Sequence, residues 1–207
     1  DFIKDAAKHH ESPAEEPANV TFAQPAFDDG EWEALSLPHD WAVKGPFYTG
    51  RNPAVGAGMG RLPSQGIAWY RRKFGLEDGD IGKAVYLDLD GAMSHAMVWL
   101  NGRFVGGWPY GYASWRVDLT PFVVAGDNTV AIRLDNAVDN SRWYPGAGIY
   151  RNVWLTLVHP THVGQTGTYV TSRQVSAASA TVDLVVQIEN TAAGDSAAEV
   201  QVATDIY

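Results

Sequence analysis

The sequence predicts an all-β protein whose larger part is a β-sandwich of the jelly-roll kind. Between residues 67 and 157, apolar and polar residues alternate over short runs, which is the two-residue period of a half-buried strand. Turns rich in glycine, proline and asparagine separate these runs, and no segment of this range keeps a helical period. Many short strands joined by such turns are typical of a sandwich or jelly roll.

The composition supports a folded core and excludes several classes of partner. The chain has 207 residues, of which 45% are hydrophobic and 12% aromatic, so global disorder is not expected. It carries 15 basic and 24 acidic residues, a net charge of −9, which disfavours nucleic acid and anionic membrane surfaces as partners. Cysteine is absent. Disulfides and thiolate metal sites are therefore excluded, and the cellular compartment stays open.

The N-terminal third has few periodic apolar positions. We predict a short strand at Phe2 and an exposed loop over residues 3–19. Residues 27–32 predict a turn or a single helical turn that an aspartate caps. Residues 35–41 are expected to be extended, because a residue that precedes proline is pushed towards β geometry. Residues 44–66 hold many glycines and prolines and are predicted to form a long loop.

The β signal is clearest from residue 85 onwards. Residues 85–90 alternate, with an apolar set predicted to face the core and a polar set predicted to face solvent: Val85, Leu87 and Leu89 against Tyr86, Asp88 and Asp90. Asn101-Gly102 is the strongest short signal for a hairpin between two strands. Further strands are predicted over residues 130–134 and 153–157.

The composition changes after Pro160, which predicts a domain boundary. Aromatic residues become rare, and about three strands are predicted near residues 169–170, 182–188 and 200–202. An immunoglobulin-like sandwich needs about seven strands. We therefore predict a jelly-roll domain over residues 1–160 and part of an immunoglobulin-like domain over residues 161–207.

Six segments, in this order, resemble the N-terminal sugar-binding domain of glycoside hydrolase family 2, the family of β-galactosidases and β-glucuronidases. Each motif is weak alone, but their order and spacing make coincidence improbable. The resemblance covers about residues 27–157. The segments are Phe27–Trp32, Leu37–Trp41, Gly66–Phe74, Trp99–Gly106, Val117–Phe122 with Gly126–Asn128, and Asn140–Leu155.

The resemblance implies a jelly roll, then an immunoglobulin-like domain, then a (β/α)8 barrel in which two glutamates carry out retaining hydrolysis. It also implies that the jelly roll contributes residues to the rim of the sugar pocket. The partners would be a carbohydrate, such as a β-galactoside, and the downstream catalytic barrel. No cofactor and no metal are expected, an oligomer is compatible with the sequence, and we expect no catalytic residue in this chain.

The resemblance directs attention to Asp139, Asn140 and Arg142, which precede a Trp-Tyr-Pro turn. In the family, an acidic or amide residue near this position reaches the sugar hydroxyls. Carboxylate, amide and guanidinium groups bind hydroxyls with fixed geometry. The competing interpretation is an Asx-turn, with Arg142 paired to a nearby acid. Some family members place an aspartate closer to the tryptophan, so Arg142 departs from the pattern and the contact residue stays open.

Two other regions contribute candidates. The resemblance implies that Asn101 can lie at the active site, although the hairpin alone already explains the Asn-Gly pair. The loop after the hairpin holds four aromatic residues, and aromatic faces can stack on a sugar ring. Trp108, Tyr110 and Tyr112 are the better surface candidates, whereas Trp115 is expected to pack in the core.

Other polar clusters are interpreted as structural. Asp88 and Asp90 have the spacing of one strand face, and we expect them to be solvent-facing acids rather than a catalytic pair. His39-Asp40 lacks a serine in a nucleophile context, so it predicts a hydrogen-bonded turn. The cluster at residues 9–11 lacks fixed geometry for a metal, and residues 56–60 lack the lysine of a phosphate loop.

Two alternative functions remain open beside the glycosidase. A freestanding carbohydrate-binding module would show sugar affinity in this chain alone. A structural spacer would show none and would expose an apolar patch. We expect a flat sugar titration, because a pocket shared between domains is incomplete in one of them.

Overall fold

The all-β prediction is confirmed. The structure, a computed structural model, describes residues 20–47, 49–50, 62, 66–136, 146–191 and 199–205. Strands dominate these residues, with short 3-10 helices at η2 (Thr21–Ala23) and η3 (Asp78–Asp80). The chain divides into two compact units, Asp1–Leu157 and Val158–Tyr207. The predicted strand at Phe2, the loop over 3–19 and most of the predicted loop over 44–66 lie outside the described residues.

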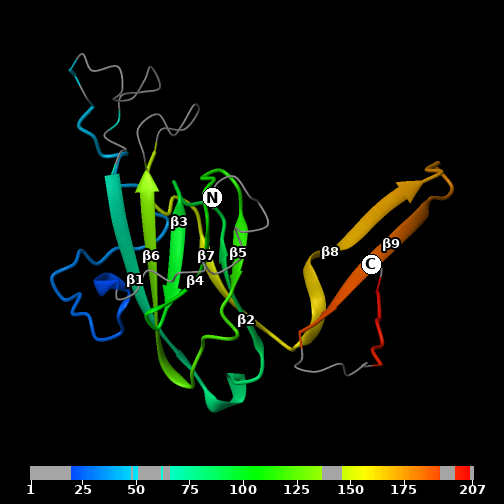
Figure 1. Cartoon of the computed structure of the whole chain (residues 1–207). Coiled ribbons are helices and arrows are strands. Elements are labelled where there is room, and N and C mark those ends of the chain that lie inside the picture. The colour runs from blue at the N-terminus through cyan, green and yellow to red at the C-terminus, as the bar shows by residue number, and fades with distance from the viewer. Residues whose placement is uncertain are drawn as a thin grey trace. The chain divides into compact units, whose positions relative to one another are not determined.

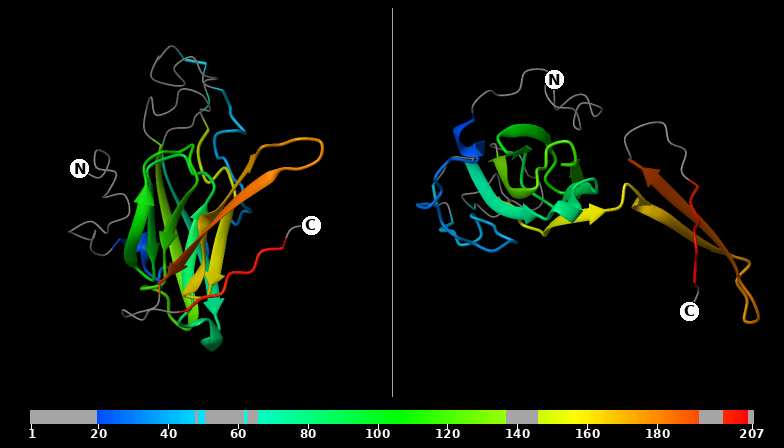
Figure 2. Two further views of the ribbon diagram at one scale, coloured as in Figure 1. Left: turned by 90° about the vertical axis from the view of Figure 1, so that its right-hand side faces the viewer. Right: turned by 90° about the horizontal axis from the view of Figure 1, so that it is seen from below.

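The first unit is a sandwich of two sheets (Figure 1). The larger sheet has the order β1, β6, β3, β4, with bounds Gly66–Leu76, Gly126–Asn136, Ala96–Leu100 and Arg103–Trp108. The smaller sheet has the order β5, β2, β7, with bounds Trp115–Asp118, Ala84–Leu89 and Val153–Val158. The β1–β6, β3–β6, β3–β4 and β2–β5 pairs are antiparallel. The view from below shows the strands of this unit arranged around a central core (Figure 2).

Alternate residues from both sheets fill that core, as the period-two pattern predicts. The apolar sets predicted for residues 85–90 and 130–134 are buried and belong to one cluster. Residues of β3 and β5 complete it from the facing sides. Its central members are Val85, Leu87, Leu89, Val98, Leu100, Val117, Val130, Ile132 and Leu134.

The prediction that Asp88 faces solvent is wrong. All six residues of β2 are buried, and Asp88 is 8% exposed. Its carboxylate accepts hydrogen bonds from Arg116 at 2.6 and 3.0 Å and from the Thr156 hydroxyl at 2.7 Å. The Arg116 guanidinium also lies 4.4 Å from the centre of the Tyr86 ring. Because β2 is the central strand of its sheet, side chains of the neighbouring strands β5 and β7, Arg116 and Thr156, cover the face that was expected to be exposed to solvent.

The segment before β1 covers the outer face of the larger sheet. Ala23 packs there in a second apolar cluster with Trp99, Phe104 and Ala131. Arg71 of β1 fastens the segment, because its side chain is only 2% exposed and donates to Asp29 at 2.8 Å. This hydrogen bond lowers the pKa of Asp29.

The predicted turn over residues 27–32 is confirmed. The Gly30 amide donates to the Asp28 carboxylate at 3.0 Å, and the Trp32 amide donates to the Asp29 carbonyl at 3.0 Å. The first bond is the Asx-turn that aspartate forms with the amide two residues on. The aromatic side chains at both ends of the turn, Phe27 and Trp32, meet edge to face with centroids 5.5 Å apart.

The second unit contains a two-stranded hairpin, β8 (Thr161–Arg173) with β9 (Thr181–Asn190). The strand predicted near residues 200–202 is wrong, because residues 199–205 form no strand. Val170, Val182 and Leu184 share one face of the hairpin, and each is more than one-third exposed. A lone hairpin is marginally stable in water. That this hairpin begins an immunoglobulin-like sandwich stays a prediction. Within the described parts of the chain, every helix is too short to cross a bilayer.

Candidate functional site

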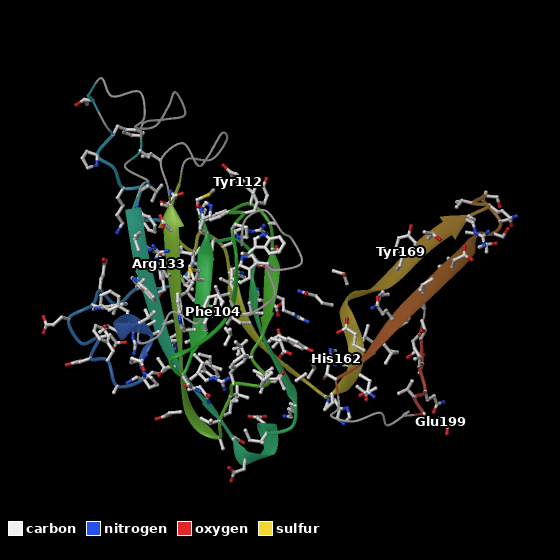
Figure 3. All side chains as sticks on the ribbon, viewed as in Figure 1. Phe104, Tyr112, Arg133, His162, Tyr169 and Glu199 are labelled. Carbon is white, nitrogen blue, oxygen red and sulfur yellow. The ribbon has the colours of Figure 1, made fainter. Side chains whose placement is uncertain are left out.

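Several loops meet at one end of the first unit, which we call the rim end. β4 ends there at Trp108 and β6 ends there at Asn136, while β3 and β7 begin there. The opposite end, which we call the hairpin end, contains the Asn101–Gly102 turn and the start of β6. Figure 3 shows Tyr112 at the rim end, whereas Phe104 lies towards the middle of the sandwich.

An aromatic loop, residues 109–114, lies at the rim end. Tyr110 is 57% exposed, and its ring meets that of Tyr112 edge to face with centroids 5.5 Å apart. Trp108 is half-buried and packs against the main core, so it presents less of its ring than the sequence suggested. Trp115 is 6% exposed, which confirms its predicted place in the core. Tyr110 is therefore the most exposed aromatic residue of this region.

Backbone groups on both sides of Tyr110 are held by hydrogen bonds from other segments. The His95 amide donates to the Pro109 carbonyl at 3.1 Å. The Tyr150 hydroxyl donates to the Gly111 carbonyl at 2.9 Å. Burial raises the pKa of Tyr150, so its hydroxyl keeps its proton well above neutral pH.

The residues on either side of segment 137–145, Asn136 and Gly146, also lie at the rim end. Asn136 is 3% exposed, and its side-chain amide donates to the Gly146 carbonyl at 3.2 Å. The Ser94 hydroxyl lies 3.4 Å from the carbonyl oxygen of that amide. Asp139, Asn140 and Arg142 themselves lie outside the described residues. Asn136 and Gly146, which flank this segment, therefore lie beside the aromatic loop. The contacts of Asp139, Asn140 and Arg142 stay a prediction.

The predicted hydrogen-bonded turn at His39-Asp40 is confirmed. The Asp40 carboxylate accepts from the backbone amides of Ala42 at 2.7 Å and Ala147 at 3.2 Å. The backbone amides of His39 and Trp41 donate to the carbonyls of residues 149 and 147, at 2.8 and 3.1 Å. This segment thus holds the chain directly after residue 145.

Tyr70 completes this contact. Its hydroxyl lies 2.9 Å from His39 Nδ1, and burial raises the pKa of Tyr70 to about 12. Gly148 approaches so closely that a Cβ there would lie 2.8 Å from the Tyr70 hydroxyl and 2.5 Å from the His39 carbonyl oxygen. Its φ of 118° also favours glycine.

Asn101 lies at the hairpin end, away from Trp108 and Tyr110. Its amide nitrogen donates to the Asn128 side chain at 2.9 Å, and its amide oxygen accepts from the Thr129 backbone at 2.9 Å. Asn128 and Asn136 are eight residues apart on one strand, or roughly 26 Å at about 3.3 Å per residue. This geometry supports the hairpin interpretation of Asn101 and does not bring it to the rim end.

A cavity of about 680 Å³ opens elsewhere, between β1 and β7 beneath residues 29–37. No motif in the sequence predicts it. Its lining combines core side chains such as Leu87 and Ile132 with charged side chains such as Asp29, Glu33 and Arg72. Among the described residues, no three His, Asp or Glu side chains are grouped to hold a metal ion, and residues 9–11 lie outside that range.

Sequence reasoning missed the anchors of the rim end. His95 and Tyr150 each donate one hydrogen bond to the aromatic loop, which is distant from them in sequence. No local sequence motif predicts such bonds. One signal was available at Gly111. A glycine between two tyrosines indicates close approach of the backbone to another element, and a Cβ there would lie 2.4 Å from the Met93 sulfur.

The described part of the first unit is a two-sheet β-sandwich with an exposed aromatic loop at one end. Residues 13–160 match the sequence model of glycosyl hydrolases family 2, sugar binding domain. The chain belongs to this family, as the motif order predicted.

Related proteins and solved structures agree with this assignment. The chain is 46% identical over 170 residues to the β-galactosidase BoGH2A of Bacteroides ovatus, and 39% identical over 142 residues to a putative β-glucuronidase of Formosa agariphila. These matches cover 81% and 68% of this chain but only 20% and 13% of the relatives. The crystal structure of a β-glycosidase from Bacteroides vulgatus superposes with a TM-score of 0.74 at 33% identity, covering 87% of this chain and 23% of that one. The chain thus spans about a fifth of the length of such relatives.

Proposed function

We propose that this chain is the N-terminal, non-catalytic region of a β-galactosidase-like exo-glycosidase, and that its rim end contributes contacts to the sugar pocket. The downstream barrel would hydrolyse terminal β-glycosides with retention. Two carboxylates about 5–5.5 Å apart carry out that reaction, one as acid/base and one as nucleophile. A β-galactoside is the preferred substrate in this proposal, because the relative with 46% identity is a β-galactosidase.

The exposure of Tyr110 on a loop held at both sides is the observation that carries the proposal. A tyrosine ring offers an apolar face to the carbon–hydrogen face of a pyranose and a hydroxyl to its oxygens. Because the backbone beside it is already ordered, sugar binding costs little conformational entropy there. Asp139, Asn140 and Arg142 belong to the same proposal, since the described residues on either side of their segment, Asn136 and Gly146, lie at the rim end.

Alanine substitutions in the full-length enzyme test this function. We expect Tyr110→Ala to raise KM for a nitrophenyl β-galactoside about tenfold, the effect of losing about 1.4 kcal/mol of binding. The variants Asp139→Ala, Asn140→Ala and Arg142→Ala identify the polar contact. Tyr169→Ala is the matched control, since Tyr169 is 65% exposed on β8 in the other unit.

The results separate three functions. If Tyr110→Ala and all three polar variants keep full activity, the rim contact is wrong and a structural spacer is favoured. A sugar titration of the 207-residue chain alone, followed by NMR chemical shifts, is expected to be flat. Saturable shifts at Tyr110 would instead favour a freestanding carbohydrate-binding module.

A further inference from the structure

We infer that Tyr150 is a positioning residue, which holds the aromatic loop so that Tyr110 is presented to the sugar. The inference rests on the function proposed above and adds to it a residue that acts through another. The reasons are the position of its hydrogen bond in the loop, the close packing of the loop on the sandwich, and the way the Tyr150 ring is itself held.

The Tyr150 hydrogen bond falls at the point where it restrains Tyr110 most. Pro109 is held from one side through its carbonyl, which accepts the His95 amide at 3.1 Å. Gly111 is held from the other side through its carbonyl, which accepts the Tyr150 hydroxyl at 2.9 Å. Tyr110 lies between these two fixed peptide groups while more than half of it faces solvent. Removing either bond frees the backbone on one side of an exposed ring.

Gly111 lies too close to the sandwich for the loop to shift inwards. A Cβ at Gly111 would lie 2.4 Å from the sulfur of Met93 and 3.3 Å from its Cα. Met93 is fixed in turn by Gly148, since their backbones exchange two hydrogen bonds of 2.9 and 3.2 Å. The chain that carries Tyr150 therefore also fixes the surface on which the loop rests. The Tyr150 hydroxyl supplies the restraint that keeps Gly111 on that surface.

The ring of Tyr150 is itself packed against the sandwich. A Cβ at Gly91 would lie 2.9 Å from both Cζ and the hydroxyl oxygen of Tyr150, so the ring end rests directly on the Gly91 backbone. A long side chain usually loses rotamer freedom when it makes a hydrogen bond. Packing on Gly91 restricts that freedom in advance, which lowers the entropic cost of the bond from the Tyr150 hydroxyl to Gly111.

The variant Tyr150→Phe tests the inference, because it removes one hydroxyl and keeps the ring. In the 207-residue chain, we expect the amides of residues 110–112 to exchange with solvent faster. In the full-length enzyme, we expect KM for a nitrophenyl β-galactoside to rise about fivefold, the effect of one net hydrogen bond, with kcat unchanged. Tyr169→Phe is the matched control, because it removes the hydroxyl of an exposed tyrosine outside the first unit.

A double variant decides whether Tyr150 acts through Tyr110. If it does, Tyr110→Ala with Tyr150→Phe raises KM no further than Tyr110→Ala alone, about tenfold, because the ring to be positioned is gone. A rise of about fiftyfold, the product of the two, would overturn the inference by showing that Tyr150 acts elsewhere. An unchanged KM for Tyr150→Phe beside a raised KM for Tyr110→Ala would overturn it too. An unchanged KM for Tyr110→Ala would instead contradict the proposed function itself.

Discussion

The two ends of the sandwich are both built from loops, but they use polar side chains in opposite ways. At the hairpin end, the side-chain amides of Asn101 and Asn128 form hydrogen bonds with one another and with the backbone. Asn128 is fully buried, donates to the carbonyls of Val124 and Gly126 at 2.7 and 3.0 Å, and accepts from the Val124 amide at 3.0 Å. At the rim end, the anchors His95 and Tyr150 are half-buried, and Tyr110 between the two bonds that they make faces solvent.

This difference separates structural from functional side chains without reference to residue type. A side chain whose donors and acceptors are used inside the domain has little left to offer a ligand. Asn101 and Asn128 meet that description at the hairpin end. Tyr110 does not, because its neighbours are held by hydrogen bonds to their backbone and its own ring is left exposed. Substitutions at the two ends should therefore have separable effects on stability and on sugar binding.

The largest expected effect is loss of stability from Asn128→Ala. This change removes a fully buried amide that bonds the backbone of Val124 and Gly126, and it removes the acceptor for Asn101. We expect the free energy of unfolding to fall by about 3 kcal/mol, measured by urea denaturation of the chain. Asp127→Ala is the control, because Asp127 is its exposed neighbour on β6 and should change stability by less than about 0.5 kcal/mol.

The stability of Asn128→Ala also tests whether the hairpin end differs from the rim end in how its polar side chains are used. A loss close to that of Asp127→Ala would mean that water replaces the amide network at little cost. The hairpin end would then be no more closed than the rim end. The contrast between the two ends would have to be given up.

A smaller effect is expected from substitutions of Asn101. Its φ is 52°, in the left-handed region, so alanine suffers both backbone strain and the loss of the side-chain amide. Glycine loses only the amide. We expect Asn101→Ala to lower the free energy of unfolding by about 2 kcal/mol and Asn101→Gly by about 1 kcal/mol.

The KM of Asn101→Gly in the full-length enzyme tests whether the hairpin end takes part in sugar binding. An unchanged KM is expected, since the amide of Asn101 is used at the hairpin end. A raised KM, with the unfolding midpoint preserved, would mean that Asn101 contacts the sugar and that the two ends are not separate in function.

Much of the fold was predictable because period-two alternation and turn chemistry are local. Alternation alone predicts strands over residues 85–90 and 130–134 and the buried face formed by Val85, Leu87 and Leu89, and Asn101-Gly102 predicts the hairpin. The prediction failed at Asp88, because burial of a polar residue depends on which strands flank it. Arg116 and Thr156 lie 28 and 68 residues further along the chain. No pattern within β2 reveals that they will cover it.

The candidate site was predictable only in part. Aromatic composition pointed to the loop of Tyr110, since the types and their clustering are visible in the sequence. The ranking within that loop was not, because Trp108 packs against the core and Tyr110 does not. Whether Asn101 contacts the sugar stays a prediction, although it lies at the other end of the hairpin from Trp108. Strand direction sends one end of β4 to the hairpin end and the other to the rim end, and the sequence motif carries no such direction.

A further expected effect distinguishes the two ends by pH. Tyr70 supports the rim end, and burial raises its pKa to about 12, whereas the amides at the hairpin end do not titrate. An unfolded tyrosine ionises near pH 10, so above that pH the unfolded state loses a proton that the folded state keeps. The stability contributed by neutral Tyr70 is therefore complete below pH 10 and is lost as pH rises towards 12. Urea unfolding over this range should show a fall in stability that is shallower in Tyr70→Phe, which has no proton to lose. Equal slopes in the two proteins would mean that Tyr70 ionises as readily in the folded chain as in the unfolded one, and that its contact with His39 does not depend on a neutral hydroxyl.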